Sequence, residues 1–196
     1  MDVRELVRRA LEEDGAARDV TTLATVPEGA LARGVFLAKE DLVVSGLEVA
    51  ALVFEVVDAR VRVSGLLSEG ARVSRNTVIG SVEGPARALL QAERVALNFA
   101  QRLSGVATLT GKFVEAVAGT RTKIRDTRKT TPLLRALQKR AVLAGGGVSH
   151  RAGLDDAILI KDNHVRLAGS VGEATRRAVA AALGRAVEVE VEREDQ

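Results

Sequence analysis

The sequence predicts a protein of mixed α/β and α+β class, built from two successive parts. In the first hundred residues, short strands are mixed with one or two helices, which is an α+β pattern. Further along the chain, strand-like and helix-like segments alternate regularly, as in the βαβ units of a parallel sheet or barrel. Between the two patterns Gly105 interrupts a long amphipathic stretch, so we predict domains over residues 1–105 and 106–196.

The first part begins with a predicted helix. Asp2 can cap this helix, its apolar residues recur at helical spacing, and Gly15 is a stop signal. A second helix is predicted over residues 46–57, where the apolar side chains share one face. Short strands are predicted over residues 32–39, 42–44, 61–63 and 77–82, and turns over residues 19–22, 69–70 and 83–85.

Two helices are predicted on either side of the domain boundary, one over residues 86–103 and one over 106–117, the latter ended by Gly119. The alternating elements are then a strand over 122–126, a helix over 133–143, a strand over 157–161, a helix over 173–183 and a strand over 186–192. These make only about three β/α units, whereas a closed barrel of this kind usually needs ~250 residues. We therefore expect a truncated barrel, with its remainder missing from this sequence.

The composition excludes several classes of protein. Of the 196 residues, 46% are hydrophobic and 28% are charged, which is typical of a globular protein and not of a disordered one. The sequence has no cysteine, which excludes disulfides, thiolate metal sites and a cysteine nucleophile. No apolar run approaches the ~18 residues of a membrane span, and the start of the chain is charged, unlike a signal peptide. We expect a cytoplasmic protein with no membrane partner.

Basic residues are concentrated between Arg94 and Arg151, although the net charge of the chain is only +3. A local excess of positive charge predicts an anionic partner. The sequence has no Trp, no Tyr and four Phe, so few side chains can stack on bases. This counts against binding of single-stranded nucleic acid.

The first candidate site is residues 126–132, Asp-Thr-Arg-Lys-Thr-Thr-Pro, which follow a predicted strand directly. Thr130 or Thr131 can cap the helix that begins here, and the proline fits its first turn. A helix N-terminus beside Arg128 and Lys129 would bind an anion through free N–H groups, the helix dipole and two full charges. The alternative is an ordinary capped helix with basic residues on its surface.

The second candidate is residues 145–151, Gly-Gly-Gly-Val-Ser-His-Arg. Three glycines let the backbone approach a ligand closely or adopt positive φ angles, and His150 and Arg151 follow them. The alternative is a flexible connector with a histidine on its surface.

The third candidate is the end of the predicted strand at Lys161. Here an apolar run changes abruptly to Lys-Asp-Asn-His, residues 161–164. Polar residues at the carboxyl end of a parallel strand face the mouth where such folds bind ligands. A lysine at this position supplies a point charge for phosphate or carboxylate. The alternative is a strand that simply returns to solvent.

The fourth candidate is an alternating run near the end of the chain. Glu188, Glu190 and Glu192 occupy one face of the predicted strand, and valines occupy the other. Carboxylates that face a site can bind Mg²⁺, bond to ribose hydroxyls or stabilise a cationic sugar. The alternative is an edge strand with a solvated acidic face.

Together, these motifs are more specific than any one of them alone. They occur in the order 93–98, 101–108, 126–132, 145–151, 159–164 and 188–191. This series resembles the quinolinate phosphoribosyltransferases, the carboxylating nicotinate-nucleotide pyrophosphorylases. The resemblance begins at Asp19 and runs through essentially the whole chain.

The resemblance implies a fold and an activity. The fold is an N-terminal α/β sandwich domain followed by an α/β barrel related to the TIM barrel. The activity is the conversion of quinolinate and phosphoribosyl pyrophosphate, with Mg²⁺, to nicotinate mononucleotide, pyrophosphate and CO₂ in NAD biosynthesis. The family forms homodimers or higher homo-oligomers, in which the N-terminal domain of one subunit covers the barrel mouth of the next.

The resemblance also implies roles for single residues. The residues expected to contact the quinolinate carboxylates are Arg128, His150, Arg151 and Lys161, with Arg94 supplied across the subunit interface. Lys129 and Lys161 are expected to contact phosphates, and Glu190 is expected near the ribose and the metal. Lys129, Lys161 and Glu190 are therefore the expected catalytic residues. No metal ligand is assigned.

Three alternatives remain open. One is a relative with the same fold that is linked to molybdenum transport. Another is a non-catalytic basic module that binds nucleic acid. The third is an inactive fragment, because the family continues past Glu190 with another acidic residue and the loops for the 5′-phosphate. We expect no turnover from a chain of this length by itself.

Overall fold

The computed structural model describes residues 2–194, which form two compact units. The first unit contains the chain up to Asp126 together with Thr130–Ser149. The second contains Thr127–Lys129 and the described residues from His150 onward. Each unit is described by itself below. The predicted domain boundary at residue 105 stays a prediction.

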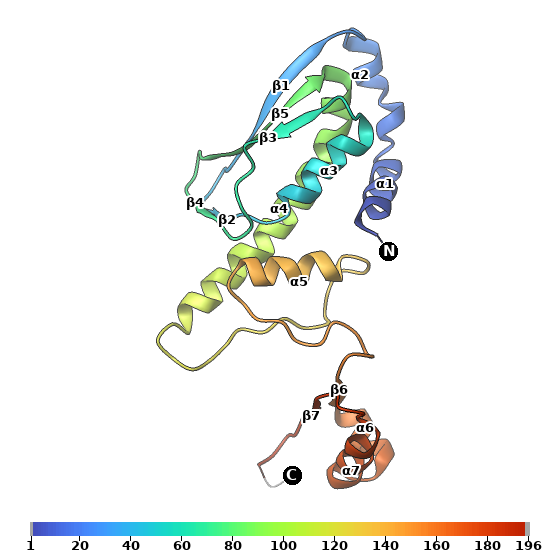
Figure 1. Ribbon diagram of the computed structural model, residues 1–196, viewed down its shortest axis with the longest axis vertical. Coiled ribbons are helices and arrows are strands. Elements are labelled where there is room, and N and C mark those ends of the chain that lie inside the picture. The colour runs from blue at the N-terminus through green and yellow to red at the C-terminus, as the bar shows by residue number, and fades with distance from the viewer. Residues whose placement is uncertain (1, 195–196) are drawn as a thin grey trace. The chain divides into compact units, whose positions relative to one another are not determined.

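The first unit combines two small antiparallel sheets with helices (Figure 1). Its larger sheet has the order β1-β5-β3, and its smaller sheet pairs β2 with β4. The strands are β1 (Leu31–Leu37), β2 (Leu42–Val43), β3 (Arg62–Ser64), β4 (Arg72–Val73) and β5 (Val78–Pro85). The helices are α1 (Val3–Asp14), α2 (Val20–Thr25), α3 (Leu47–Val57), α4 (Ala86–Ala116) and α5 (Arg135–Ala144), with a short 3₁₀ helix at Ala16–Arg18.

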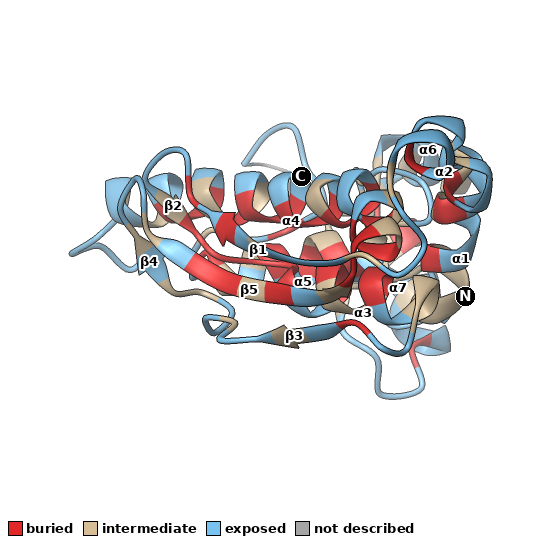
Figure 2. Cartoon of the chain, turned by 90° about the horizontal axis from the view of Figure 1, so that it is seen from above, coloured by how far each residue is buried: buried red, intermediate tan, exposed pale blue. Residues whose placement is uncertain are grey.

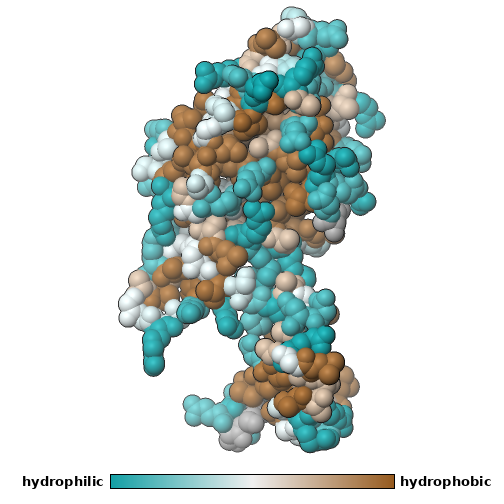
Figure 3. Space-filling model, in the orientation of Figure 1, coloured by the Kyte–Doolittle hydropathy of each residue, from teal (hydrophilic) through white to brown (hydrophobic). Residues whose placement is uncertain are grey.

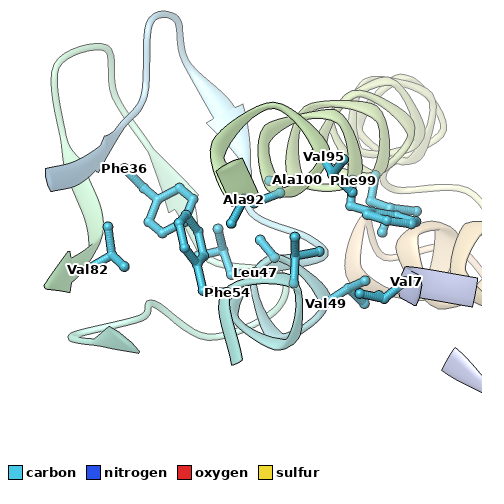
Figure 4. Packing of buried hydrophobic residues seen from close by; sticks show 14 of the residues in the cluster. Val7, Phe36, Leu47, Val49, Phe54, Val82, Ala92, Val95, Phe99 and Ala100 are labelled. Atoms are coloured by element: carbon cyan, nitrogen blue, oxygen red, sulfur yellow. The ribbon is translucent and has the colours of Figure 1, made fainter. Parts of the chain in front are cut away.

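The core of this unit lies where α3 and α4 pack against each other and against the larger sheet. Figure 4 shows Phe36 of β1 meeting Phe54 of α3 edge-to-face, with ring centroids 6.0 Å apart. Leu47 and Ala92 are almost completely buried beside them. In Figure 2 the buried residues, coloured red, follow the inner faces of the helices and the centre of β5. This unit therefore has a substantial hydrophobic core of its own. Burial of apolar side chains is the main driving force of folding.

Two hydroxyl groups of α4 bond to the backbone of β2 and of the residues that follow it. Thr108 accepts the N–H of Val43 at 2.8 Å, and Ser104 accepts the N–H of Ser45 at 3.0 Å. Between them, the N–H of Val44 points the other way and donates to the carbonyl of Ala71. Successive N–H groups of residues 43–45 thus donate alternately to hydroxyls of α4 and to a backbone carbonyl next to β4.

The structure corrects two of the predicted turns. Residues 19–22 begin helix α2, because the Asp19 carboxylate caps it: Asp19 accepts the N–H of Thr22 at 3.0 Å. The hydroxyl of Thr22 donates to the same carboxylate, and these bonds hold the pKa of Asp19 below its usual range. The second predicted turn, residues 83–85, is instead the end of β5, paired with the start of β1.

Two further predictions are wrong around α4. This helix runs without a break through Gly105, and the predicted pair of helices is one helix of 31 residues. A single glycine costs a helix only about 1 kcal/mol, and the buried Leu103 and Ala107 on either side hold the helix in place. Residues 122–126 form no strand; only one parallel bridge joins Arg125 to Val148.

The second unit contains one parallel βαβ arrangement. Strands β6 (Ile158–Ile160) and β7 (Val187–Val189) pair in parallel, and helices α6 (Asp162–Ala168) and α7 (Val171–Ala181) lie between them in the chain. The predicted parallel pairing is therefore confirmed. Helix α6 falls where the sequence predicted only a strand end, and β7 is shorter than the predicted strand over 186–192.

Candidate active site

The candidate site lies at the carboxyl ends of β6 and β7. Ile160 pairs with Val189 in the parallel register, so the residues that follow these two strands are neighbours. The N–H of Glu190 continues the ladder by donating to the carbonyl of Ile160 at 2.9 Å. Lys161 follows β6 directly, and its Nζ donates to Glu190 Oε2 at 2.8 Å. Both side chains remain partly open to solvent, 44% and 57% exposed.

A second pair joins Glu188 of β7 to His150, which lies outside the strands. His150 Nε2 and Glu188 Oε2 are 2.8 Å apart, and the His150 side chain is only 19% exposed. Because side chains alternate along a strand, Glu188 and Glu190 occupy the same face, as the sequence predicted. Each carboxylate thus meets one of the predicted substrate-binding residues. Glu192 lies beyond the end of β7 and is exposed.

His164 shapes the backbone at this edge. The N–H of Lys161 donates to His164 Nδ1 at 2.9 Å, which forms part of the cap of helix α6. The histidine is therefore held one helical turn from Lys161, and its bonded ring nitrogen is the acceptor. His164 is part of the Lys-Asp-Asn-His run of the third candidate site, but the sequence predicted no role for it.

Arg151 is held at the start of the loop that leads into β6. Its Nη1 donates to the carbonyl of Ala157 at 3.2 Å. Within the same loop, the Asp156 carboxylate accepts the N–H of Ala152 at 2.6 Å. Backbone N–H groups, that of Ala152 first, hold the pKa of Asp156 below its usual range.

We expect the contribution of Asp156 to depend on pH with a defined sign. A lowered folded-state pKa stabilises the loop above the usual pKa of 3.8, and this contribution is lost as the pH falls through the lower folded value. Asp156→Asn should therefore speed amide exchange at Ala152 at pH 6, and the difference from the wild type should shrink at pH 2. An equal difference at both pH values would contradict this role.

The segment that carries Arg128 and Lys129 differs from its prediction in one respect. Helix α5 begins at Arg135 with Leu134 as its N-cap, so Thr130 and Thr131 do not cap it. The predicted capping by these threonines is therefore wrong, and anion binding by Arg128 and Lys129 stays a prediction. The threonines do not cap the helix because of a turn at residues 132–133, where Leu133 adopts a φ of 68° before the helix starts.

The structure nevertheless brings most of the predicted residues into one compact unit. Residues 127–129 belong to the same unit as His150 and the two strand ends. Six predicted site residues share this unit: Arg128, Lys129, His150, Arg151, Lys161 and Glu190. Arg94 belongs to the other unit, where it lies exposed on α4.

The glycine run at 145–147 approaches a helix of its own chain. Gly146 has a φ of 88°, which favours glycine. A methyl group on Gly145 would lie 2.7 Å from Thr110 Cβ and would overlap the carbonyl oxygen of Ala107 on α4. On Gly147 it would lie 2.6 Å from a methyl carbon of Val142. The glycines are thus required for close packing within the first unit.

We expect Gly145→Ala to lower the free energy of unfolding by roughly 1–3 kcal/mol, the usual cost of overpacking. Gly145 itself has an ordinary φ of −74°, so the cost comes from the clash with α4 and not from backbone strain. Gly105→Ala is the matched control, because a methyl there meets nothing within 4 Å and removes a glycine from a helix. Urea unfolding should show opposite shifts for the two variants.

A buried ion pair within the first unit was not predicted. Lys139 of α5 donates to the Asp126 carboxylate, and the two side chains are 10% and 3% exposed. The sequence placed Lys139 only in the general basic excess, since a lysine in a charged helix usually lies in water. No sequence signal marks it as buried.

Two further features of the described chain bear on function. Across residues 2–194, no three or more His, Asp or Glu side chains gather into a group that could hold a metal ion. No helix in this part of the chain is long and apolar enough to cross a membrane.

The chain is similar to known proteins along nearly its whole length. Family models described as the N-terminal and the C-terminal domain of quinolinate phosphoribosyl transferase match residues 19–104 and 106–196. The nicotinate-nucleotide pyrophosphorylase [carboxylating] of Mycobacterium leprae is 48% identical and aligns with 98% of this chain and 69% of its own length. The quinolinate phosphoribosyltransferase [decarboxylating] 2b, mitochondrial, of Nicotiana tabacum is 44% identical, and the chain spans 50% of its length.

Solved structures agree with these sequence relatives. The nicotinate-nucleotide pyrophosphorylase from Francisella tularensis superposes with a TM-score of 0.93 at 40% identity, over 98% of this chain and 68% of that one. NadC from Streptococcus pyogenes gives a TM-score of 0.90 at 42% identity, over 96% of this chain and 67% of that one. The fold of the chain, although it spans only part of each relative, is therefore shared with these proteins.

Proposed function

The chain belongs to the quinolinate phosphoribosyltransferase family, and from this premise we propose that it takes part in NAD biosynthesis as that enzyme. In the reaction, the ring nitrogen of quinolinate attacks C1 of the ribose of phosphoribosyl pyrophosphate, and pyrophosphate leaves. The 2-carboxylate then departs as CO₂, and its bonding electron pair remains on the ring carbon, which takes up a proton. The product is nicotinate mononucleotide.

One observation carries this proposal above the others. A lysine and a glutamate end two adjacent parallel strands and are bonded to each other at 2.8 Å. The carboxyl edge of parallel strands is where α/β folds bind their ligands. The basic residues of three separate motifs belong to the same unit as this edge. Such a cluster suits a dicarboxylate and a polyphosphate that must be held close together despite their mutual repulsion.

Quinolinate would be held by Arg128, His150, Arg151 and Lys161. Arginine can bond to a carboxylate with two parallel N–H groups, which fixes the plane of the ligand as well as its position. His150 Nε2 lies 2.8 Å from Glu188 Oε2, and this contact orients the imidazole ring at the carboxyl edge of the two strands. Fixed orientation of both carboxylates directs the ring nitrogen at the ribose carbon.

Lys129 and Lys161 would contact the phosphates, and Glu190 the ribose. An exposed ion pair such as Lys161–Glu190 contributes only about 0–1 kcal/mol, so Lys161 can exchange this partner for a substrate anion at little cost. Glu190 then lies near a ribose carbon that gains positive charge as pyrophosphate leaves. A carboxylate at that position stabilises the transition state more than the ground state.

Mg²⁺ fits this site as an ion carried by the substrate. Mg²⁺ is usually bound by one or two carboxylates together with substrate phosphates, not by a cage of protein ligands. Glu190, which follows β7 directly, is the residue that would contact the ion. When bound, Mg²⁺ would neutralise charge on the pyrophosphate leaving group.

A homodimer or higher homo-oligomer would complete the site, with the partner subunit's Arg94 contacting quinolinate. Two features of α4 support this. Arg94 is exposed, and exposed apolar residues follow it along the helix, among them Leu109 and Phe113, 57% and 56% exposed. Figure 3 shows apolar side chains, coloured brown, gathered on the visible face of the first unit. Large exposed apolar surfaces mark interaction sites.

Cytoplasmic location stays a prediction. The names of some plant relatives assign them to mitochondria or chloroplasts, whereas the name of the Mycobacterium leprae relative gives no compartment.

The test begins with the intact mass of the purified protein, followed by titration calorimetry with quinolinate on the same sample. We expect saturable binding of quinolinate. Release of labelled CO₂ from its 2-carboxyl group, once phosphoribosyl pyrophosphate and Mg²⁺ are added, is expected only if the measured mass exceeds that of these 196 residues. Binding without turnover at a mass near 20.7 kDa would favour an inactive fragment. Absent quinolinate binding, together with nucleic-acid binding that falls steeply with salt, would favour the basic module.

A further inference from the structure

Three polar side chains of helix α5 bond to residues that come, along the chain, just before and just after the segment that carries Arg128 and Lys129. These side chains are spaced three and four residues apart, which puts them on one side of the helix. Each contacts a residue that flanks residues 127–129, and the three are Arg135, Gln138 and Lys139. One helix thus holds the chain on both sides of a segment of only three residues.

The upstream anchor is the buried ion pair. Lys139 donates to the Asp126 carboxylate, and Asp126 immediately precedes the segment. The backbone of Asp126 is fixed as well, because its N–H donates to the carbonyl of Val148 at 3.1 Å. Leaving a buried carboxylate without its partner cation is costly, so the ion pair with Lys139 keeps the Asp126 side chain in place.

The downstream anchor is a reciprocal amide contact. Gln138 Oε1 accepts the N–H of Thr131 at 2.9 Å, and its Nε2 donates to the hydroxyl of the same threonine at 3.0 Å. Arg135 adds a bond from Nε to the hydroxyl of Thr130 at 3.2 Å. These contacts hold the two residues that immediately follow the segment.

Between the anchors, the segment is bonded to itself. The hydroxyl of Thr127 accepts the N–H of Lys129 at 3.1 Å. The four other polar residues of the Asp-Thr-Arg-Lys-Thr-Thr motif therefore all shape the loop: Asp126, Thr127, Thr130 and Thr131.

We propose that Gln138 and Lys139 are positioning residues for substrate binding, which hold the loop of Arg128 and Lys129 in its binding conformation before the anions arrive. The inference rests on the proposed function of Arg128 and Lys129. A loop that is already ordered pays less entropy on binding, and small displacements of charged groups weaken binding strongly. Neither positioning residue needs to touch substrate for this effect.

Gln138→Leu is the main test, because it removes both bonds to Thr131 and keeps a helix-forming side chain of similar length. We expect quinolinate to bind about ten-fold more weakly, or worse, in calorimetry of the folded protein. Calorimetry with phosphoribosyl pyrophosphate should show weaker binding of this ligand too, since Lys129 is on the same segment. The urea midpoint should change little, because this contact is on the surface. A purely structural role would move the urea midpoint and leave the affinity unchanged.

Thr131 supplies the matched pair of variants. Thr131→Val removes the hydroxyl and should weaken quinolinate binding. Thr131→Ser keeps the hydroxyl and should bind quinolinate as the wild type does. The losses from Thr131→Val and Gln138→Leu should not add in the double variant, because both remove one contact. Full additivity would contradict the proposed contact.

Lys139 is tested by Lys139→Gln combined with Asp126→Asn, a neutral pair that can still share a hydrogen bond. This double variant should fold and should bind quinolinate more nearly as the wild type does than either single variant. Arg128→Ala distinguishes the two proposals. If the wild type binds and Arg128→Ala does not, wild-type affinity in Gln138→Leu overturns the positioning role alone. If the wild type itself does not bind quinolinate, the proposed function fails first.

Discussion

Arg128→Ala should weaken quinolinate binding by about 100-fold or more. The reason is that an arginine bonded to a carboxylate in a partly desolvated site contributes charge and two directed hydrogen bonds, and truncating one partner of such a pair costs roughly 2–5 kcal/mol. Arg128 is half-buried within the second unit and lies beside the exposed Lys129. Calorimetry of the purified variant against quinolinate gives the affinity directly.

Arg140→Ala is the control for this experiment. Arg140 lies on α5, is exposed, and pairs with Glu48 at 3.0 Å, so its removal takes away the same formal charge outside the proposed site. We expect its quinolinate affinity to stay within about two-fold of the wild type, since exposed pairs contribute little. Equal losses in the two variants would mean that general positive charge, and not a specific contact, holds the ligand.

The largest loss of stability is expected at the buried ion pair. Asp126→Ala leaves the Lys139 ammonium buried without its partner carboxylate, which typically costs 3–5 kcal/mol of the free energy of unfolding. The same loss is expected for Lys139→Met, which leaves the carboxylate. Urea unfolding at pH 7 measures both, and a marginal protein of this size can lose most of its stability in this way.

The double variant Asp126→Asn, Lys139→Gln shows whether the loss comes from an isolated charge. We expect it to regain much of the stability, because no charge is then left buried alone. Arg176→Gln is a suitable control, since it removes one partner of a solvent-exposed ion pair with Glu173 and should change stability by less than about 1 kcal/mol. Equal effects at the buried and the exposed pair would show that burial does not matter here.

Local patterns were sufficient to predict the elements that build the site. The apolar run ending at Lys161 and the alternating valines and glutamates around Glu188 predicted two strands, because short apolar or alternating runs with polar ends are typical of strands in parallel sheets. The structure confirms both strands, their parallel pairing and the shared face of the glutamates. What the pattern could not supply was the register, and the register decides that Lys161 meets Glu190 and that His150 meets Glu188.

The wrong predictions share a physical cause. Gly105 was expected to end a helix, and Thr130 or Thr131 was expected to cap one. Such signals are reliable only where local energetics decide the structure. At Gly105 the packing of α4 outweighs a cost of about 1 kcal/mol, and the helix continues. At Thr130 and Thr131 the hydroxyls bond to side chains of α5, so neither caps its first turn. The buried Lys139 was missed for the same reason, because its partner is thirteen positions earlier in the chain.

The hydroxyls of Ser104 and Thr108 have a consequence for the behaviour of the protein at high concentration. A strand with a row of unpaired N–H groups is a template on which another chain can add a strand, and sheets of this kind drive aggregation. Along Val43–Ser45 the outward donors are already taken, since two side chains from α4 accept them. A helix therefore closes this edge as a neighbouring strand would, and it leaves no backbone donor of Val43 or Ser45 with which a second molecule could extend the sheet.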